Sequence, residues 1–307
     1  MKKKVLIVGG TGFIGYHLAK RCLNKNWEVT SFSTRKPKSY RYLKKVKYLI
    51  GDISNRKDIK KKIKNRFHFV VNLGGYIDHS NKKKVFQSHL IGCKNLANFF
   101  LKKNIKAFIQ MGSSNEYGKL KSPHKENLSG NPLSPYGRAK LQASRFLLSL
   151  FKKKNFPVII LRLYQAYGPK QEVNRLIPIL IVNSLKDNQY PCSEGKQFRD
   201  FIYVDDVVSA IFKCFSKNKK ELSGQILNLG TGKPIKIKKI IKMITLKVKK
   251  GKPQYGKIKM RKDEIMKIYP STKKASKILK WKPKISFSKG LTKTYNSYKK
   301  DYKIIEN

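Results

Sequence analysis

The chain has 307 residues, of which 71 are Lys or Arg and only 17 are Asp or Glu, so its formal net charge is +54. Hydrophobic residues make up 40%, enough to bury a core, which excludes a disordered polyelectrolyte. No stretch reaches the roughly 20 apolar residues of a membrane-spanning helix. The apolar run that starts at Val5 stops at Gly9, too early for a signal peptide. We therefore expect a cytoplasmic protein with no membrane insertion.

Basic residues are spread along the whole chain rather than gathered in one segment. Lysine accounts for 60 of the 71 basic residues, and Lys-Lys pairs occur even in the expected loops. A nucleic-acid-binding domain would concentrate its charge on one face or one helix. We therefore interpret the charge as lysine at exposed positions in general, and expect no specific nucleic-acid partner.

Cysteine and histidine show no metal-binding pattern. The four cysteines form neither a zinc spacing nor a disulfide framework, so we expect them to be small core residues. They are Cys22, Cys93, Cys192 and Cys214. The histidines and carboxylates do not cluster either, and the sequence predicts no metal site.

Short apolar runs alternate with amphipathic stretches over residues 1–165. Such runs predict strands buried on both faces, and the stretches between them predict helices. We expect strands at residues 5–8, 28–33, 46–50, 69–73, 107–111 and 158–163, and the clearest helices at residues 12–24, 83–103 and 135–153. The pattern predicts an α/β fold with a parallel sheet covered by helices on both faces.

A glycine-rich loop directly follows the first expected strand and opens the first expected helix. Its glycines allow a tight turn and let the backbone approach a pyrophosphate at the positive end of the helix. The residues expected to border a dinucleotide here are Gly9, Thr11, Gly12, Phe13, Ile14 and Gly15. The strand before and the helix after make this a specific prediction of dinucleotide binding.

The end of the second expected strand bears on the choice of dinucleotide. An acid at this position would bind the ribose 2′-hydroxyl of NAD, but the chain has Ser33, Thr34, Arg35 and Lys36. Hydroxyls and cations suit the 2′-phosphate of NADP, so NADP is the expected cofactor, with Ser33 and Arg35 as contacts and NAD as the alternative. After the third strand, we expect Asp52 and Ile53 to border the adenine.

Tyr136 and Lys140 stand four residues apart, in a segment that predicts a helix starting at Ser134-Pro135. Residues at this spacing share one face of a helix. A nearby ammonium stabilises the phenolate of Tyr136. The tyrosine can then take or give the proton of a hydroxyl while hydride moves at the same carbon.

These motifs and others resemble those of the extended short-chain dehydrogenases/reductases, the NAD(P)-dependent nucleotide-sugar epimerases, dehydratases and reductases. The resemblance covers almost the whole chain and includes the segments at residues 111–118, 161–169, 199–206 and 274–283. It implies a Rossmann-type doubly wound parallel sheet in residues 1–165, with a returning segment at about 200–230. Residues 166–307 would then form a smaller, mainly substrate-binding C-terminal lobe.

The resemblance also implies roles for individual residues. Ser113 would hydrogen-bond the sugar oxygen beside Tyr136, and Lys140 would also contact the nicotinamide ribose. The cofactor would be bordered after the fourth strand by Leu73, Gly74 and Gly75. The nucleotide-sugar side would hold Ser114, Gln165, Arg175, Arg199 and Arg261, where arginine suits phosphate oxygens.

The residues after Ser113 separate the subfamilies. In the sugar 4,6-dehydratases the next two positions supply an acid and a base, but here they are Ser114 and Asn115, and an amide cannot act as a base. Glu116 comes one position later and, on an extended segment, would face the opposite way. The motif more closely resembles reductases of 4-keto-6-deoxy nucleotide sugars and some uncharacterised epimerases. His89, where the family usually has Asn, leaves the nicotinamide contacts open.

We therefore expect an enzyme that moves hydride at carbon 4 of a nucleotide-activated hexose, as in cell-surface polysaccharide biosynthesis. Reduction of a 4-keto sugar ranks first, and a 4-epimerase with tightly bound NAD is the alternative. A 4,6-dehydratase and a non-catalytic nucleotide- or RNA-binding relative rank below both, because a binding module has no need for Ser113, Tyr136 and Lys140 together.

Two helices resemble the pair that forms an intermolecular four-helix bundle in this family, which implies a homodimer. They are the expected helices at residues 83–103 and 135–153. The apolar side chains that could form the shared faces at helical spacing are Leu90, Leu96, Phe100, Leu141, Phe146 and Leu150.

Overall fold

The computed structural model describes residues 2–76, 78, 80–216, 219–260 and 263–306. The first half of the chain forms β1 (Lys4–Val8), α1 (Phe13–Asn24), β2 (Glu28–Ser33), η1 (Ser39–Arg41), β3 (Val46–Ile50), α2 (Arg56–Lys62), β4 (Phe69–Asn72), α3 (Lys82–Phe86), η2 (Gln87–Ile91), α4 (Gly92–Leu101), β5 (Ala107–Ser113), η3 (Ser114–Glu116) and α5 (Pro135–Lys154). The second half forms β6 (Val158–Leu163), β7 (Gln165–Tyr167), α6 (Leu176–Leu185), β8 (Gln189–Pro191), β9 (Phe198–Arg199), β10 (Phe201–Tyr203), α7 (Val204–Ser216), α8 (Lys219–Leu222), β11 (Gln225–Leu229), β12 (Ile235–Lys236), α9 (Ile237–Val248), β13 (Lys252–Gln254), β14 (Lys267–Ile268), α10 (Lys273–Leu279) and α11 (Phe287–Glu306).

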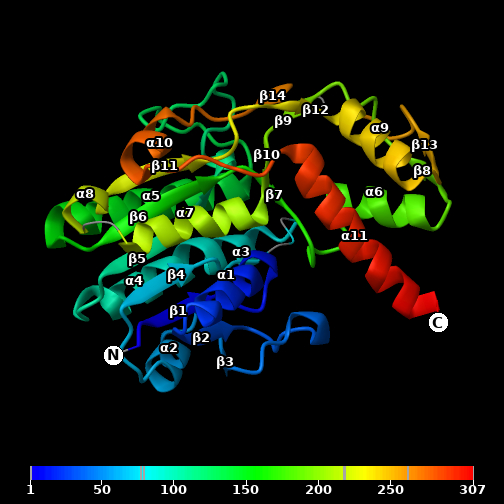
Figure 1. Ribbon diagram of the computed structural model, residues 1–307. Coiled ribbons are helices and arrows are strands. Elements are labelled where there is room, and N and C mark those ends of the chain that lie inside the picture. The colour runs from blue at the N-terminus through cyan, green and yellow to red at the C-terminus, as the bar shows by residue number, and fades with distance from the viewer. Residues whose placement is uncertain (1, 77, 79, 217–218, 261–262, 307) are drawn as a thin grey trace.

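The largest sheet in the described part of the chain has seven parallel strands in the order β11-β6-β5-β4-β1-β2-β3 (Figure 1). The direction of winding reverses between β1 and β4. In open α/β sheets, ligands bind outside the carboxyl ends of the strands at this reversal. The predicted doubly wound parallel sheet is confirmed, and β2, β3 and β6 have the predicted bounds.

Helices cover both faces of this sheet, because each strand contributes alternate side chains to two separate cores. Val5 and Ile7 of β1 point to the core shared with α1, α7 and α10, whereas Leu6 and Val8 point to the core shared with α2, α4 and α5. Period-two alternation in a strand buried on both faces requires the continuous apolar run seen in the sequence. Figure 1 shows α1 and α7 together on one side of the strands.

The later elements form a third core beside the sheet. It contains apolar side chains from α6, α9, α11, β8 and β10. Phe13, at the start of α1, belongs to this core as well, and so does Tyr167 of β7. The glycine-rich loop therefore lies where the large sheet and the later elements meet.

The sequence predicts that the two long helical segments present apolar faces to a second copy of the chain, and the structure differs in part from that expectation. The first is divided into α3, the π-helical η2 and α4. Four of the six named side chains, Leu90, Leu96, Phe100 and Leu141, are at most 8% exposed, and those of the first segment pack into the chain's own core. Only Phe146 and Leu150 remain half-buried. The homodimer therefore stays a prediction, and these four side chains are largely covered within the single chain.

The four cysteines are buried and free, as the sequence predicts. Burial raises the pKa of Cys22, Cys93 and Cys214 to about 12, so these thiols stay protonated at neutral pH. Among the residues that the structure describes, no helix has both the length and the apolar character to span a bilayer.

Candidate active site

The glycine-rich loop makes a compact turn against the end of β4. Gly9 has a φ of +76°, and a Cβ atom added there would lie 3.0 Å from the backbone nitrogen of Gly74. A Cβ on Gly15 would lie 2.3 Å from the Gly9 carbonyl oxygen. Glycine is needed at both positions, because any side chain would push the first turn of α1 away from the loop.

Residues predicted to border a dinucleotide converge at this edge of the sheet. The Ser33 hydroxyl, at the end of β2, accepts a hydrogen bond from the Thr11 backbone N–H at 3.4 Å. Ile53 lies next to Gly74, since a Cβ there would be 3.6 Å from its Cδ1 atom. Asp52 holds its own loop by accepting the Ser54 N–H at 2.8 Å. These residues come from four separate segments of the chain.

Phe13, Ile14 and Arg35 are also predicted to border the cofactor, but they differ in the groups that are available to bind it. Phe13 is buried in the third core and Ile14 packs against two cores, so their side chains serve packing and their backbone N–H groups lie at the start of α1. Such N–H groups favour a bound anion. Arg35 is exposed and follows β2 by two residues.

Helix α5 places Tyr136 and Lys140 beside the end of β5. The Ser134 hydroxyl caps the helix by accepting the Gly137 N–H at 3.0 Å. The buried Lys140 ammonium donates to the Met111 carbonyl of β5 at 2.7 Å and lies 5.8 Å from the centre of the Tyr136 ring. An ammonium has three N–H donors, and this bond uses one of them.

Close backbone approach brings Tyr136 to the segment that follows Ser113. A Cβ on Gly137 would lie only 2.5 Å from the Asn115 carbonyl oxygen, so glycine allows α5 to contact η3. The Ser113 hydroxyl accepts the Asn115 N–H at 3.2 Å. The three predicted catalytic residues therefore lie at the same carboxyl edge of the sheet as the glycine-rich loop.

His89 is a further residue beside Tyr136. Its ring meets the Tyr136 ring edge-on, with the ring centres 4.9 Å apart, and its Nε2–H donates to the Tyr76 carbonyl at 3.0 Å. A Cβ on Gly75 would lie 1.8 Å from the His89 ring. The structure thus places this departure from the family pattern between the predicted cofactor segment and the tyrosine.

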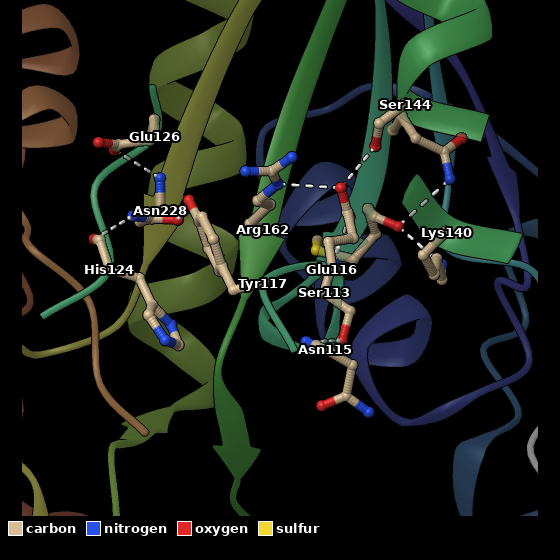
Figure 2. A network of polar contacts seen from close by, with 12 residues as sticks. Ser113, Asn115, Glu116, Tyr117, His124, Glu126, Lys140, Ser144, Arg162 and Asn228 are labelled. Carbon is tan, nitrogen blue, oxygen red and sulfur yellow. Dashed lines mark hydrogen bonds and ion pairs between the residues drawn. The ribbon is translucent and has the colours of Figure 1, made fainter. Parts of the chain in front are cut away.

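The expectation for Glu116 is wrong in its geometry. The chain does not stay extended after Ser113 but turns in the 3-10 helix η3, so the Glu116 carboxylate folds back and is fully buried (Figure 2). It pairs with Arg162 at 2.9 Å. Arg162 is the one charged residue in an otherwise apolar strand, and this pattern is the sequence signal that could have predicted the pair.

The predicted nucleotide-sugar residues are only partly brought together. The exposed Gln165 lies beside Arg199, because its backbone N–H donates to the adjacent Asp200 carbonyl at 3.0 Å. Arg175 precedes α6 at its N-terminal end. Ser114 is 5% exposed and lies in η3. Arg261 lies outside the described residues.

The guanidinium of Arg199 is bound by residues of the same chain. Its guanidinium forms an ion pair with Glu264 and donates to the Phe198 carbonyl at 2.8 Å. Burial lowers the pKa of Arg199, and the Glu264 charge opposes that shift. Among the described residues, no group of His, Cys, Asp and Glu side chains is placed to hold a metal ion.

The sheet reversal, the glycine-rich loop and the Tyr136–Lys140 pair define a dinucleotide-binding protein of the Rossmann class. Residues 5–230 match the model of the NAD dependent epimerase/dehydratase family, and the chain belongs to that family. The match contains both the loop and the predicted catalytic residues.

Proteins similar to this chain include nucleotide-sugar 4-epimerases and 4,6-dehydratases. A bifunctional UDP-glucose 4-epimerase and UDP-xylose 4-epimerase of Arabidopsis thaliana is 28% identical over 92% of each chain. A dTDP-D-glucose 4,6-dehydratase of Mus musculus is 26% identical over 98% of this chain and 90% of the mouse protein. The solved UDP-glucuronic acid 4-epimerase of Bacillus cereus, in complex with UDP-glucuronic acid and NAD, has a TM-score of 0.87 and 25% identity over 97% of this chain and all of the other.

Proposed function

We propose that this chain is a nucleotide-sugar 4-epimerase that uses NAD. The observation that carries the proposal is the arrangement of Ser113 on β5 and of Tyr136 and Lys140 on α5, joined through the 2.7 Å bond from Lys140 to Met111. The sequence ranks 4-keto reduction first. The names of similar epimerases favour the redox-neutral reaction, which needs the same three side chains.

The residues at the sheet edge fit a dinucleotide. Gly9, Gly15 and Gly74 let the loop, α1 and the end of β4 pack closely together, and the first N–H groups of α1 would hold the pyrophosphate. Lys140 would hold the nicotinamide ribose with its remaining donors. When bound, the dinucleotide supplies the acceptor and donor of hydride at carbon 4 of the sugar.

Tyr136 would move the proton at the carbon 4 oxygen. It takes the hydroxyl proton as the carbon is oxidised and returns a proton when the carbon is reduced from the other face of the sugar. Ser113 would hydrogen-bond the same oxygen, and the Lys140 ammonium would favour the negative charge on the tyrosine. His89 would fix the plane of the Tyr136 ring by its edge-on contact.

Elimination of water is not supported by these side chains. Asn115 is exposed and is an amide, which cannot accept a proton as a base at neutral pH. The nearest carboxylate, Glu116, is fully buried and already accepts hydrogen bonds from Ser113, Ser144 and Arg162. A 4,6-dehydratase reaction would therefore lack its proton-transfer pair.

The elements after residue 165 would hold the nucleotide. Arg199 and the adjacent Gln165 would meet the diphosphate, with Arg175 as a further cation. For Arg199 to bind a phosphate, the Glu264 carboxylate has to leave the guanidinium, so substrate binding exchanges one anion for another. The UDP-sugars bound by similar proteins make UDP-hexoses the first class to test.

A second candidate is the reduction of a 4-keto nucleotide sugar by NADPH. The observation that favours it is the end of β2, where Ser33 is followed by the exposed Arg35 and no acid. A charge-assisted contact contributes about 1.5–3 kcal/mol, or roughly 10- to 150-fold in affinity. Arg35→Ala would then remove most of a preference for NADP(H) and leave NAD(H) binding unchanged, in titrations of both cofactors at fixed salt. Equal affinities in the parent protein would remove this candidate.

The test of the proposed function is a panel of UDP-, dTDP-, GDP- and CDP-hexoses with their 4-keto derivatives. An epimerase forms the 4-epimer without net change in NAD(P)H, whereas a reductase consumes one NADPH per product. Turnover should disappear in Tyr136→Phe. No turnover of any sugar, together with salt-dependent RNA binding, would instead support a non-catalytic role.

A further inference from the structure

Glu116 lies directly under the predicted catalytic serine. It is the last residue of η3, the single turn that follows Ser113, and its side chain is 0% exposed. A buried carboxylate is rare unless each oxygen has hydrogen-bond donors. The donors that surround Glu116 come from three different elements, and they show what this residue connects.

Each carboxylate oxygen of Glu116 has a defined partner. Oε1 accepts the backbone N–H of Ser113 at 2.9 Å, while Oε2 accepts the Ser144 hydroxyl and the Arg162 Nε–H, both at 2.9 Å (Figure 2). Ser144 is one helical turn beyond Lys140 and two turns beyond Tyr136 on α5. The carboxylate therefore joins the strand that carries Ser113 to the helix face that carries the other two predicted catalytic residues.

The surrounding backbone leaves room for this side chain and its turn. A Cβ on Gly112 would lie 2.6 Å from Oε1 of Glu116, and a Cβ on Gly130 would lie 2.1 Å from its carbonyl oxygen. Gly112 also pairs with Arg162 across the β5–β6 ladder. Larger residues at these two positions would displace Glu116 from its contact with Ser113.

Stability alone is a weak reason for such a pair. Removing two charges from water is costly, and well-packed apolar residues often replace a buried ion pair with no loss of stability. Burial opposes the charge of Arg162, whereas Glu116 and Tyr117 favour it strongly enough to raise its pKa. The guanidinium thus stays charged, and the distinctive property of the pair is the fixed direction of its hydrogen bonds.

We propose that Glu116 is a positioning residue, whose carboxylate holds the Ser113 backbone and the Ser144 hydroxyl and so sets the spacing between Ser113 and Tyr136. The inference rests on the proposed function of these two side chains at the sugar oxygen. A spacing error of about 1 Å at reacting groups can cost on the order of 100-fold in rate, so a fixed carboxylate between β5 and α5 has a direct kinetic consequence.

The test compares Glu116→Gln, the double variant Glu116→Leu with Arg162→Met, and the control Glu126→Gln. Glutamine keeps an acceptor but turns an amide N–H toward Arg162. The double variant removes both charges, so no unpaired charge stays buried and folding is preserved. Glu126 is the matched carboxylate of the same network, since it accepts the Asn228 N–H at 3.0 Å and has no contact with Ser113 in Figure 2.

We expect kcat to fall at least about tenfold in both Glu116 variants, with KM within about threefold of the parent value. The double variant should show this loss even when its melting temperature is within about 3 °C of the parent. Glu126→Gln should keep the parent kcat. A double variant with parental melting temperature and parental kcat would show that Glu116 only supports folding, and would overturn the proposal.

A crystal structure of the double variant separates this inference from the proposed function. We expect the distance between Ser113 Oγ and Tyr136 Oη to change by more than about 0.5 Å relative to the parent, a tolerance typical of reacting groups. If the parent turns over no nucleotide sugar, the proposed function fails, and the distance alone decides the inference. An unchanged distance overturns it.

Discussion

Two arginine–glutamate pairs in this protein have the same chemistry and different surroundings. The side chains of Arg162 and Glu116 are 3% and 0% exposed, and the pair lies between β6 of the large sheet and α5. Those of Arg199 and Glu264 are 13% and 23% exposed and lie among the later short strands and loops. The first pair is closed to solvent, whereas the second is partly open to it.

The difference in burial determines what each ion pair can do. In the closed pair Glu116 also binds the backbone of Ser113 and the hydroxyl of Ser144, so it fixes the geometry of neighbouring residues. In the open pair Glu264 occupies the guanidinium that we propose for the substrate phosphates. We therefore expect changes in the first pair to affect stability and kcat, and changes in the second to affect substrate binding.

The largest expected effect is on stability. Glu116→Leu alone leaves the Arg162 charge buried without its partner, and should lower the free energy of unfolding by about 3–5 kcal/mol. Glu264→Leu removes a partly exposed partner and should cost about 1 kcal/mol or less. Urea unfolding of both variants measures the contrast. Similar losses in the two variants would mean that burial does not distinguish these pairs.

The next effect is on turnover. Tyr136→Phe keeps the ring and its contact with His89 but removes the proton donor, and should lower kcat at least about 100-fold with little change in cofactor affinity. Lys140→Met should lower both quantities, because the ammonium would also hold the ribose. Tyr295→Phe on α11 provides a control for the loss of one hydroxyl. Near-normal turnover of Tyr136→Phe would exclude the proposed proton transfer.

The open pair should respond in KM instead. Arg199→Ala removes a charge-assisted contact worth about 1.5–3 kcal/mol, and should raise KM for the nucleotide sugar roughly 10- to 150-fold while kcat changes less. Glu264→Gln weakens the competing carboxylate and should lower KM. Initial rates over a range of substrate concentrations separate the two constants. A higher KM in Glu264→Gln would contradict the exchange of anions at Arg199.

The smallest effect concerns pH. The buried His124 donates from Nε2–H to the Leu120 carbonyl and accepts the Tyr164 hydroxyl at Nδ1, each at 2.9 Å, so it is held in its neutral form. Burial lowers the pKa of His124, and the charge of Arg162 lowers it further, against the bond to Leu120.

Because the unfolded chain takes up this proton first, the contribution of His124 to stability is present above about pH 6.5 and is lost as the pH falls below that value. The slope from one proton is at most about 1.4 kcal/mol per pH unit. His124→Gln should therefore flatten the fall in unfolding free energy between pH 7 and 5, as measured by urea unfolding. An unchanged slope would mean that His124 accepts a proton in the folded protein.

Local patterns in the sequence predict the fold and the shared helix face of two candidate site residues. Strands such as β2 and β6 are continuous apolar runs, and Tyr136 and Lys140 share a helix face through their spacing alone. The Glu116–Arg162 pair could not be predicted in the same way. It depends on the turn after Ser113 and on the register that sets Gly112 opposite Arg162, and both are products of tertiary packing.

The same limit applies to the apolar helix residues. Leu90 and Leu96 have the spacing of a contact face, but periodicity cannot tell whether such a face meets the chain's own sheet or a second molecule. The partner of Arg199 could not be predicted from the sequence either, because Glu264 is 65 residues away. The sequence shows which side chains are suited to binding or catalysis. Tertiary packing determines which of them already have a partner within the chain.

In the proposed reaction, hydride leaves carbon 4 of the nucleotide sugar and returns to its other face, while Tyr136 takes and returns the proton. The most direct measurement is the reaction of the purified protein with NAD and UDP-hexoses in D₂O, followed by NMR of the sugar and by NADH absorbance. We expect the 4-epimer with no deuterium on carbon and no net NADH. A 4-keto product, deuterium at carbon 5, or net consumption of a reduced cofactor would contradict it.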